Sequence, residues 1–481
     1  MGGNGAECPP GKVEWCLQTS RSAIVEGGIP QVKAYRVAEQ RFDDPNLVAH
    51  AGLEPLLRLA DAAGLRQALG GVGVPSPNRV SKALCVIAGM AAGADSIDDM
   101  DVLRAGGMPR LFGGIAAPST LGTYLRSFTY GHARQLDAAN RGLLPGLARA
   151  VPDLFDGADG IAFVDVDDTI REVHGYRKQA AGFGYTGVRG LNAQFACVST
   201  PLASPFVAAS SLRRGKAKSG SGAPPMAATA IRAARTLGAS GMVLLRADSA
   251  YYNAAFIRAA IANQACFSVT ARMDPNVRRA IAAIPETAWT PIHYTDAVWD
   301  DEGQCWVSDA EVAETHFTAF ASKPRRDQVG CQLVVRRVKR LNPAKNQDPL
   351  FDEYRHHAFV TNAGFGAVEA DQWHRKHAIV EQVIEELKAG PLAHLPSGKF
   401  PANAAWVGLA VIAFNLQRAL GAAAGMAKAR FDTIRARLIQ VPARLARTAR
   451  TITMHLPAQW PWAPAWQLLG ERIGGPPAAA A

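Results

Sequence analysis

The feature that most constrains the fold is a change of hydrophobic period at Ile161. From here IAFVDVD alternates as a strand, with Ile161, Phe163, Asp165 and Asp167 on one face. Two more strand candidates follow, LNAQFACVS and PFVAASSL. After them come a helix (MAATAIRAARTLG), a buried strand (MVLLRAD), a second helix (YNAAFIRAAIANQ) and another strand (CFSVTARM). Three strands followed by helix–strand–helix–strand predict a mixed α/β fold.

The remaining sequence divides around this core. Residues before it place apolar side chains at i, i+3, i+4 spacing, which is typical of helices. After it, Trp289, Trp299, Trp306 and the strand CQLVVRRVKR indicate a β-rich insertion, followed by the strand HHAFVTN, a helix from about Asp371 to Ala389 and a second helix, NAAWVGLAVIAFNLQRAL. We therefore predict six parts: a partly ordered N-terminal segment (1–40), a helical domain (41–155), the first part of the core (156–284), the insertion (285–348), the second part of the core (349–425) and a basic C-terminal helical region (426–481).

Composition excludes several classes of protein. Hydrophobic residues make up 48% and charged residues 19%, which excludes a largely disordered chain. The apolar run Ala404 to Phe414 has eleven residues, and a bilayer span needs roughly 20, so we predict no membrane segment. Seven scattered cysteines without a CxxC pair argue against a disulfide framework and a zinc site. With no signal peptide pattern at the N-terminus, we predict a cytoplasmic protein.

The charge balance favours a polyanionic partner. The net charge is +11, and 39 of the 52 basic residues are arginines, whose planar fork suits phosphate. More than half of the excess lies between residues 421 and 481. In TIRARLIQVPARLARTARTITMHL, one side of a predicted helix would carry Arg437, Arg444, Arg447 and Arg450. Such a helix could follow a DNA backbone or simply face solvent, and the sequence leaves both open.

Three acidic residues stand where a shared site could form. Asp167 ends the alternating strand, Asp248 ends the buried strand MVLLRAD, and Glu381 lies on the late helix WHRKHAIVEQVIEELK. On a helical wheel the face that holds Glu381 also holds His374, His377 and Lys388, opposite an apolar face. Three converging carboxylates suit two divalent ions about 4 Å apart. Hard oxygen ligands favour Mg²⁺ or Mn²⁺ over zinc.

These blocks resemble the bacterial insertion-sequence transposases of the DDE type. The resemblance rests on VDVDDTIREVHGYR, LRRGKAKSGSGA, LLRADSAYYNAAF, and FVTN followed by the E-x6-K spacing of Glu381 and Lys388. It covers roughly residues 40 to 455 and implies an RNase H-like core with a β-strand insertion before the final Glu. It further implies that Asp167, Asp248 and Glu381 are catalytic and bind two Mg²⁺ (or Mn²⁺) ions. The implied partners are double-stranded DNA, as terminal inverted repeats and target, and a second copy of the chain in a nucleoid-associated complex.

The resemblance also suggests DNA-binding residues. Lys388 should contact a phosphate beside the cleaved strand. A related group carries Tyr-x2-Arg-x3-Glu-x6-Lys, but here His374 and His377 occupy the Tyr and Arg positions, and Arg375 is one place off. Which of these side chains contacts DNA is therefore open.

Other DNA-contact candidates lie outside that helix. The link carrying Arg213, Arg214 and Lys216 could hold transposon-end DNA or be a solvated loop. Arg246 and Tyr251 could flank the site, or form an ion pair and a packed ring. Helices within 41–155 could read DNA as a helix-turn-helix, or be a plain helical region.

Two alternative functions compete. FVDVDDTI satisfies the DxDx[TV] pattern of haloacid-dehalogenase-type phosphatases, with Asp165 as nucleophile and Asp167 as general acid/base. Such enzymes need a later acidic pair after a strand, and the sequence around Asp248 does not supply one. A DNA-binding protein that has lost catalysis is the other alternative. We take Asp167 as the first carboxylate, because its D-x-T context fits the transposase pattern better than that of Asp165.

Overall fold

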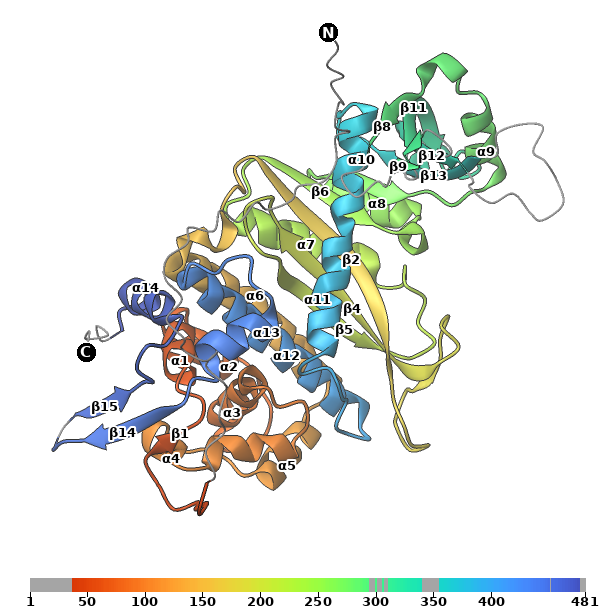
Figure 1. The fold of residues 1–481 in the computed structure, drawn as a ribbon. Coiled ribbons are helices and arrows are strands. Elements are labelled where there is room, and N and C mark those ends of the chain that lie inside the picture. The colour runs from red at the N-terminus through yellow and green to blue at the C-terminus, as the bar shows by residue number, and fades with distance from the viewer. Residues whose placement is uncertain are drawn as a thin grey trace, which may run out of the picture. The chain divides into compact units, whose positions relative to one another are not determined.

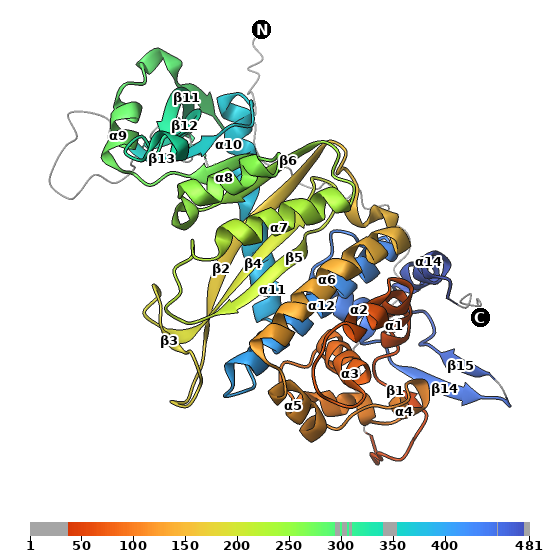
Figure 2. The same ribbon diagram turned by 180° about the vertical axis from the view of Figure 1, so that it is seen from behind.

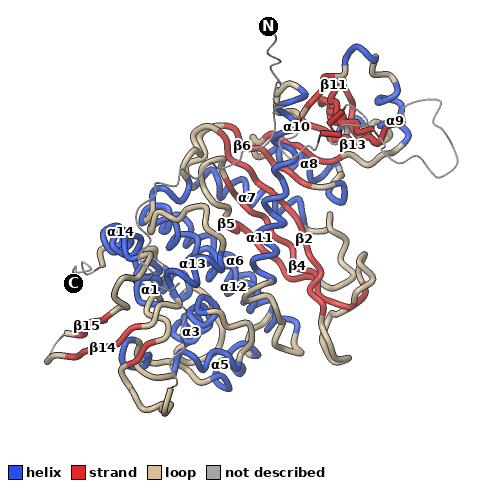
Figure 3. Tube along the Cα trace, viewed as in Figure 1, coloured by secondary structure: helices blue, strands red, loops and turns tan. Residues whose placement is uncertain are grey.

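The strand predicted from the alternation at Ile161 lies at the centre of the sheet. β2 (Ile161–Glu172) pairs in parallel with β6 (Met242–Ala247) and antiparallel with β4 (Arg189–Ser199). β5 (Phe206–Arg213) lies antiparallel to β4, and β7 (Cys266–Thr270) lies parallel to β6. The strand order β5-β4-β2-β6-β7 makes a mixed sheet that is consistent with an RNase H-like core. Figure 3 shows these strands in red with helices around them.

The computed structural model describes residues 37–293, 299–300, 305–306, 310–339, 354–449 and 451–475. Residues 44–481 form one compact unit and residues 1–43 another. Most of the predicted N-terminal segment, part of the insertion and Arg450 lie outside the described residues, as do the side chains of Trp299 and Trp306.

The β-rich insertion extends the same sheet. Beyond β7 the sheet continues, all antiparallel, through β13 (Tyr354–Thr361), β12 (Val329–Lys339), β11 (Ala310–Ala319) and β8 (Thr290–Ile292). Shorter elements complete this part of the described chain: α9 (Pro275–Ala282), η4 (Glu286–Ala288), the β9 (Trp299–Asp300) and β10 (Cys305–Trp306) pair, and η5 (Arg325–Asp327). At the opposite edge of the sheet, β3 (Gly182–Phe183) pairs with β4.

Helices cover both faces of the sheet. α7 (Ala223–Thr236) and α8 (Ala254–Ala262) lie over the face seen in Figure 2. α11 (Ile379–Lys388) crosses the other face, in front of β2 in Figure 1. The predicted helix at Asp371–Ala389 starts earlier, as α10 (Ala367–Arg375), and includes a 3₁₀ turn (Lys376–Ala378) before α11. The apolar face of α11 (Val380, Val383, Ile384 and Leu387) is buried, as the amphipathic pattern predicted.

The N-terminal helices pack against a long core helix, α12 (Phe400–Ala423). They are α1 (Leu53–Ala62), α2 (Leu65–Gly70), α3 (Arg79–Ala92), η1 (Asp98–Arg104), α4 (Met108–Leu111), α5 (Pro118–Arg126), α6 (Tyr130–Ala150) and η2 (Pro152–Phe155). The apolar run lies within a helix of 24 residues, which by length and composition alone could cross a membrane. The apolar window of α12 is fully buried inside the protein, and its Asn415 and Gln417 bond to other buried groups. α12 is thus a core helix.

The C-terminal region differs from the single basic helix that we predicted. It contains α13 (Phe431–Ile434), a π-helical turn (Arg435–Ile439), the strands β14 (Ala443–Arg447) and β15 (Ile452–His455), and α14 (Ala463–Ile473). β14 pairs with β15 and with β1 (Leu47–Val48). Pro442 ends the helical run, because proline cannot donate a backbone hydrogen bond and disfavours helix in the residue before it. Ala443 and Leu445 are then buried while Arg444 is exposed, which is the period of a strand.

Candidate active site

Two of the predicted carboxylates lie on neighbouring parallel strands. In the register of β2 and β6, Asp165 is opposite Arg246, so Asp167 and Asp248 each lie two residues further on. β6 ends at Ala247, because the Asp248 side chain caps the following 3₁₀ turn (Ser249–Tyr251) and accepts a hydrogen bond from the backbone N–H of Ala250 at 2.9 Å. β2 continues to Glu172, so Asp167 lies within the strand and not at its end as predicted. It lies at the level where the shorter β6 ends and Asp248 follows.

The electrostatics agree with this closeness. The pKa of Asp167 is raised to about 7, and burial is the main cause. The negative charges of Asp248 and Asp168 also raise this pKa, whereas the hydrogen bond from the Asp168 N–H lowers it. The pKa of Asp248 is also raised, mainly because the surrounding protein desolvates its carboxylate, with Asp168 adding to the effect. His377 opposes both shifts. A positive charge placed between these carboxylates would therefore be stabilising.

Asp165 has a different role from Asp167. Its side chain is fully buried, and Arg246 donates Nε to its Oδ1 and Nη2 to its Oδ2, both at 2.7 Å. His377 Nδ1 donates to the same Oδ1 at 2.9 Å. Burial alone would raise the pKa of Asp165, but Arg246 and His377 outweigh it and hold that pKa below its usual range. Both oxygens are occupied, so Asp165 lacks the free, accessible carboxylate that a phosphatase nucleophile needs.

Arg246 is the centre of this network. It is 1% exposed, lies over the Phe163 ring at 3.9 Å, and donates Nη1 to the carbonyl oxygen of Trp373 at 2.6 Å. It therefore joins β2 and β6 to α10. Of the two roles that the sequence left open for Arg246, the structure has the ion pair.

Asp168 organises the other side of β2. Its Oδ2 accepts from Arg213 Nη2 at 2.9 Å and from the Asn192 amide, and its Oδ1 accepts from the Tyr251 hydroxyl at 2.9 Å. Arg213 also donates to the carbonyl of Ser221 at 2.5 Å, which closes the loop after β5. The guanidinium of Arg213 is thus engaged inside the protein, and Tyr251 is a hydrogen-bonded, buried ring.

α11 carries Glu381 alongside β2. His377 bonds to Asp165, and further on Arg171 donates to the carbonyl of Ala393, so the helix runs in the same direction as β2. From His377 to Glu381 the helix advances by about 6 Å, and from Asp165 to Asp167 the strand advances by about 6.6 Å. Glu381 is exposed and is one helical turn from His377 on the same face, level with Asp167.

The other predicted residues of this helix fall into two groups. His374 lies between the hydroxyls of Ser268 (2.8 Å) and Thr270 (3.0 Å) and stacks on Phe359, with ring centroids 4.1 Å apart. Burial, together with nearby positive charges, lowers its pKa to about 3, so this imidazole is neutral. Arg375 is exposed and pairs with Asp371 at 2.8 Å. Lys388, in the last turn of α11, is half-buried and makes no hydrogen bond or ion pair within the described residues.

The basic loop after β5 presents two predicted residues to solvent. Arg214 and Lys216 are exposed on either side of the buried Gly215. A Cβ at Gly215 would lie 2.1 Å from the carbonyl oxygen of Gly190, so only glycine permits the close contact between this loop and β4. The backbone is therefore fixed while its two neighbouring cationic side chains stay accessible.

The donor set suits a hard divalent cation. Asp167, Asp248 and Glu381 offer only carboxylate oxygens, and the raised pKa of Asp167 shows a carboxylate whose charge lacks compensation. Among the described residues, no three His, Cys, Asp or Glu side chains already form a metal-binding cluster. The three carboxylates thus fit the metal by type, and bound ions would have to draw Glu381 towards Asp167 and Asp248.

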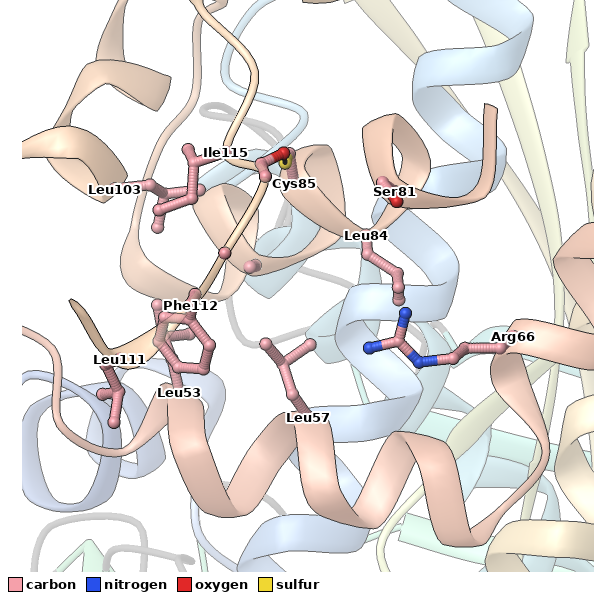
Figure 4. A pocket seen from close by; sticks show the side chains of 13 residues that line it. Leu53, Leu57, Arg66, Ser81, Leu84, Cys85, Leu103, Leu111, Phe112 and Ile115 are labelled. Carbon is pink, nitrogen blue, oxygen red and sulfur yellow. Dashed lines mark hydrogen bonds between the residues drawn. The ribbon is translucent and has the colours of Figure 1, made fainter. Parts of the chain in front are cut away.

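A cavity lies away from these carboxylates. It has a volume of about 270 Å³ and lies between α1, α3 and the 111–115 segment, with Arg66 directed towards it (Figure 4). Its lining includes Leu53, Leu57, Leu84, Leu103 and Leu111. None of its lining residues belongs to β2, β6 or α11.

Sequence reasoning missed the supporting network. Asp168, Asn192 and the Asp165–His377 contact were not predicted, although Asp165 and Asp167 were placed on one strand face. The signal for Asp168 was the third acid in DVDDT, which points to the opposite face and needs its own partner.

Comparison with known proteins agrees with this geometry. No curated protein matches the chain. The family model described as Transposase DDE domain group 1 matches residues 36–475, which is most of the chain and includes every strand and helix above. The chain therefore belongs to the DDE transposase family, whose members are enzymes of DNA transposition.

Proposed function

We propose that this transposase cuts and joins the ends of its own insertion sequence by two-metal phosphodiester chemistry on an RNase H-like core. The observation that carries the proposal is the neighbouring position of Asp167, within β2, and Asp248, directly after β6, with α11 running along β2. Asp167, Asp248 and Glu381 are the proposed catalytic and metal-binding residues. Mg²⁺ or Mn²⁺ ions, two per site, would activate the attacking water or 3′-hydroxyl and stabilise the leaving oxygen.

The protein's own groups prepare that site. Arg246 neutralises Asp165 and Arg213 pairs with Asp168, so the two acids beside Asp167 on β2 already have cationic partners. Asp165 also fixes the His377 ring, because a carboxylate oxygen only accepts and therefore selects the tautomer or charge state with a proton on Nδ1. His377 is held where its charge acts on Asp167 and Asp248, and close to any phosphate bound there.

The proposed DNA-binding surface uses the accessible cationic groups. Lys388, Arg375 and His377 on the helix and Arg214 and Lys216 on the loop after β5 are proposed to contact phosphates.

Three of the sequence-predicted DNA-binding residues are engaged inside the protein: Arg213, Arg246 and His374. For these we propose a supporting role, holding the strands and helices that carry the site. The N-terminal helices are proposed to bind the terminal inverted repeats. We further propose that two copies pair in the complex that joins both ends, in the bacterial cytoplasm.

The test is cleavage of DNA that carries the element's terminal inverted repeats. With Mg²⁺ or Mn²⁺ the wild-type protein should nick at the repeat ends, and Asp167→Asn, Asp248→Asn and Glu381→Gln should each remove this activity. Glu385→Gln is the matched control, because Glu385 is an exposed acid one turn further along α11, and it should cleave normally.

Each other outcome has a definite meaning. DNA binding without cleavage by the wild-type protein would support the catalytically inactive alternative. Hydrolysis of a generic phosphomonoester that Asp165→Asn abolishes would support the phosphatase alternative. Cleavage that survives any one of the three carboxylate substitutions would remove that residue from the proposed site.

A further inference from the structure

Three exposed aromatic rings gather in the connection between β2 and β4, here called the β2–β4 arm (residues 173–188). Tyr176 is 99% exposed, Tyr185 68% and Phe183 62%. None of the three stacks on another ring within the described part of the chain. Large apolar groups exposed together on a protein surface commonly mark a binding site.

The arm is held firmly although its rings are free. Lys178 donates to the carbonyl of Leu395, and the backbone N–H of Gln179 donates to the carbonyl of Gly398 at 3.0 Å. The Gln179 side chain accepts from the N–H of Phe400 at 3.0 Å. The arm is therefore anchored to the segment between α11 and α12. An anchored backbone with exposed rings loses little conformational entropy when a ligand stacks on it.

The arm also joins the basic loop after β5. The N–H of Gly215 donates to the carbonyl of Ala180 at 3.0 Å, and the aliphatic part of Lys216 covers Gly182. Figure 2 shows β3 and the arm beyond the main part of the sheet. The exposed rings and the exposed cations of Arg214 and Lys216 thus form one continuous surface.

This surface adjoins the proposed catalytic carboxylates. Partial burial raises the pKa of the Tyr185 hydroxyl, and the negative charges of Asp168, Asp167 and Asp248 raise it further. The backbone also holds Tyr185 near β2, because a Cβ on its neighbour Gly184 would lie 3.0 Å from Cδ1 of Ile170, three residues beyond Asp167 on that strand.

The charge of the surrounding chain favours a polyanion. The 75 residues from 173 to 247 contain ten Arg and Lys and no Asp or Glu. Duplex DNA hides its bases inside the stack, whereas unpaired nucleotides expose a flat π-face and a phosphate backbone together. Proteins that bind unpaired nucleotides combine aromatic rings with a basic groove, which is the combination found here.

We propose that the β2–β4 arm binds unpaired nucleotides of the DNA strand at the cleavage site, with Tyr185 stacking on the base nearest the carboxylates. Phe183 and Tyr176 extend the stacking surface away from the site, and Arg214 and Lys216 neutralise the adjoining phosphates. This inference rests on the proposed function, since it assigns a substrate contact to the same site. It concerns binding alone and is measured without cleavage.

The experiment compares two DNA probes in the presence of EDTA. One is a blunt duplex, and the other is the same duplex with about six unpaired thymidines at one 3′ end, a length within the range that such surfaces bind. The full-length protein should prefer the overhang. Tyr185→Ala should weaken binding to the overhang probe by about tenfold, since stacking contributes about 1–3 kcal/mol per base. Binding to the blunt duplex should change by less than about twofold on the same scale.

Two control variants separate stacking from a general disturbance. Tyr185→Phe keeps the ring and should retain the overhang preference. Leu202→Ala removes an exposed apolar side chain near the opposite end of β4 and should affect neither probe. A 2-aminopurine in the overhang should be quenched by the wild-type protein and by Tyr185→Phe, but not by Tyr185→Ala.

Three results would each overturn the proposal. Tyr185→Ala could lose affinity equally for both probes, Tyr185→Phe could lose as much affinity as Tyr185→Ala, or the wild-type protein could show no preference for the overhang. Because no metal is present, these results do not depend on catalysis. Failure here with normal cleavage of repeat-end DNA would reject the arm alone, whereas absence of cleavage would reject the proposed function.

Discussion

Replacing Asp167 by asparagine should stabilise the metal-free protein while removing its metal response. The pKa of Asp167 is raised from 3.8 to about 7, mainly by burial. Between pH 3.8 and about pH 7, the Asp167 carboxyl group therefore keeps its proton in the folded state and loses it in the unfolded state. Stability must fall as the pH rises through this window, and the cost is complete above about pH 7. Asparagine has no charge at any of these pH values and avoids that cost.

The magnitude follows from the size of the shift. Three pKa units correspond to about 4 kcal/mol as an upper limit, at about 1.4 kcal/mol per unit. Asp167 is only partly buried, and water penetration reduces the effect, so about 1–2 kcal/mol is the working expectation. Roughly two thirds of the gain should develop between pH 5 and pH 8, since the shift spans pH 3.8 to about 7.

The assay is urea unfolding in EDTA at pH 5, 6.5 and 8, for the wild type and Asp167→Asn. The asparagine variant should unfold at higher urea, with an advantage that grows as the pH rises. Added Mg²⁺ should stabilise the wild type by about 1.4 kcal/mol per tenfold increase in concentration above its Kd, and should leave the variant unchanged.

Asp168→Asn is the contrasting control, because it breaks a buried pair with Arg213 and should destabilise the protein across this pH range. An Asp167→Asn variant that is no more stable than the wild type at pH 8, or whose gain is the same at pH 5, would refute the reasoning.

Three further predictions concern the surrounding residues. Arg246→Met should lower the unfolding free energy by about 3–5 kcal/mol, because it leaves the fully buried Asp165 carboxylate without its main partner; denaturant titration measures this. Replacing Arg214 and Lys216 together by alanine should weaken DNA binding at low salt and reduce the slope of log K against log salt by about 2, as measured by fluorescence anisotropy, and an unchanged slope would place the loop away from DNA. Lys388→Ala should reduce cleavage of repeat ends with little change in stability, since Lys388 makes no hydrogen bond or ion pair within the described part of the chain, and Lys388→Arg should restore part of the activity.

Local pattern was enough to predict the elements that surround the site. The alternation at Ile161 predicted β2, and the amphipathic pattern around Glu381 predicted α11 and its buried face, because both depend on the spacing of apolar residues along a short segment. Asp248 could be placed at a strand end for the same reason, whereas the prediction that Asp167 ends its strand was wrong, because β2 continues to Glu172. Their roles in catalysis, and that of Glu381, stay predictions.

Other features depend on contacts between distant segments, which local spacing does not encode. The pairing of Asp165 with Arg246 and His377 joins β2, β6 and the turn before α11. The spacing of apolar residues in these segments does not predict it. In the C-terminal region the arginine spacing predicted a helix, although Pro442 argues against one. The structure has the strand β14 there. For α12, we counted consecutive apolar residues, and that count stopped before Asn415. The helix continues through this residue because its side chain forms a hydrogen bond inside the core.

The most direct test of the central claim is anomalous diffraction from Mn²⁺ in crystals of the protein bound to a transposon-end DNA. The account predicts two manganese peaks about 4 Å apart beside Asp167 and Asp248, with Asp167, Asp248 and Glu381 supplying carboxylate ligands. Manganese bound elsewhere, or a Glu381 carboxylate that stays out of reach of any ion beside Asp167 and Asp248, would contradict it.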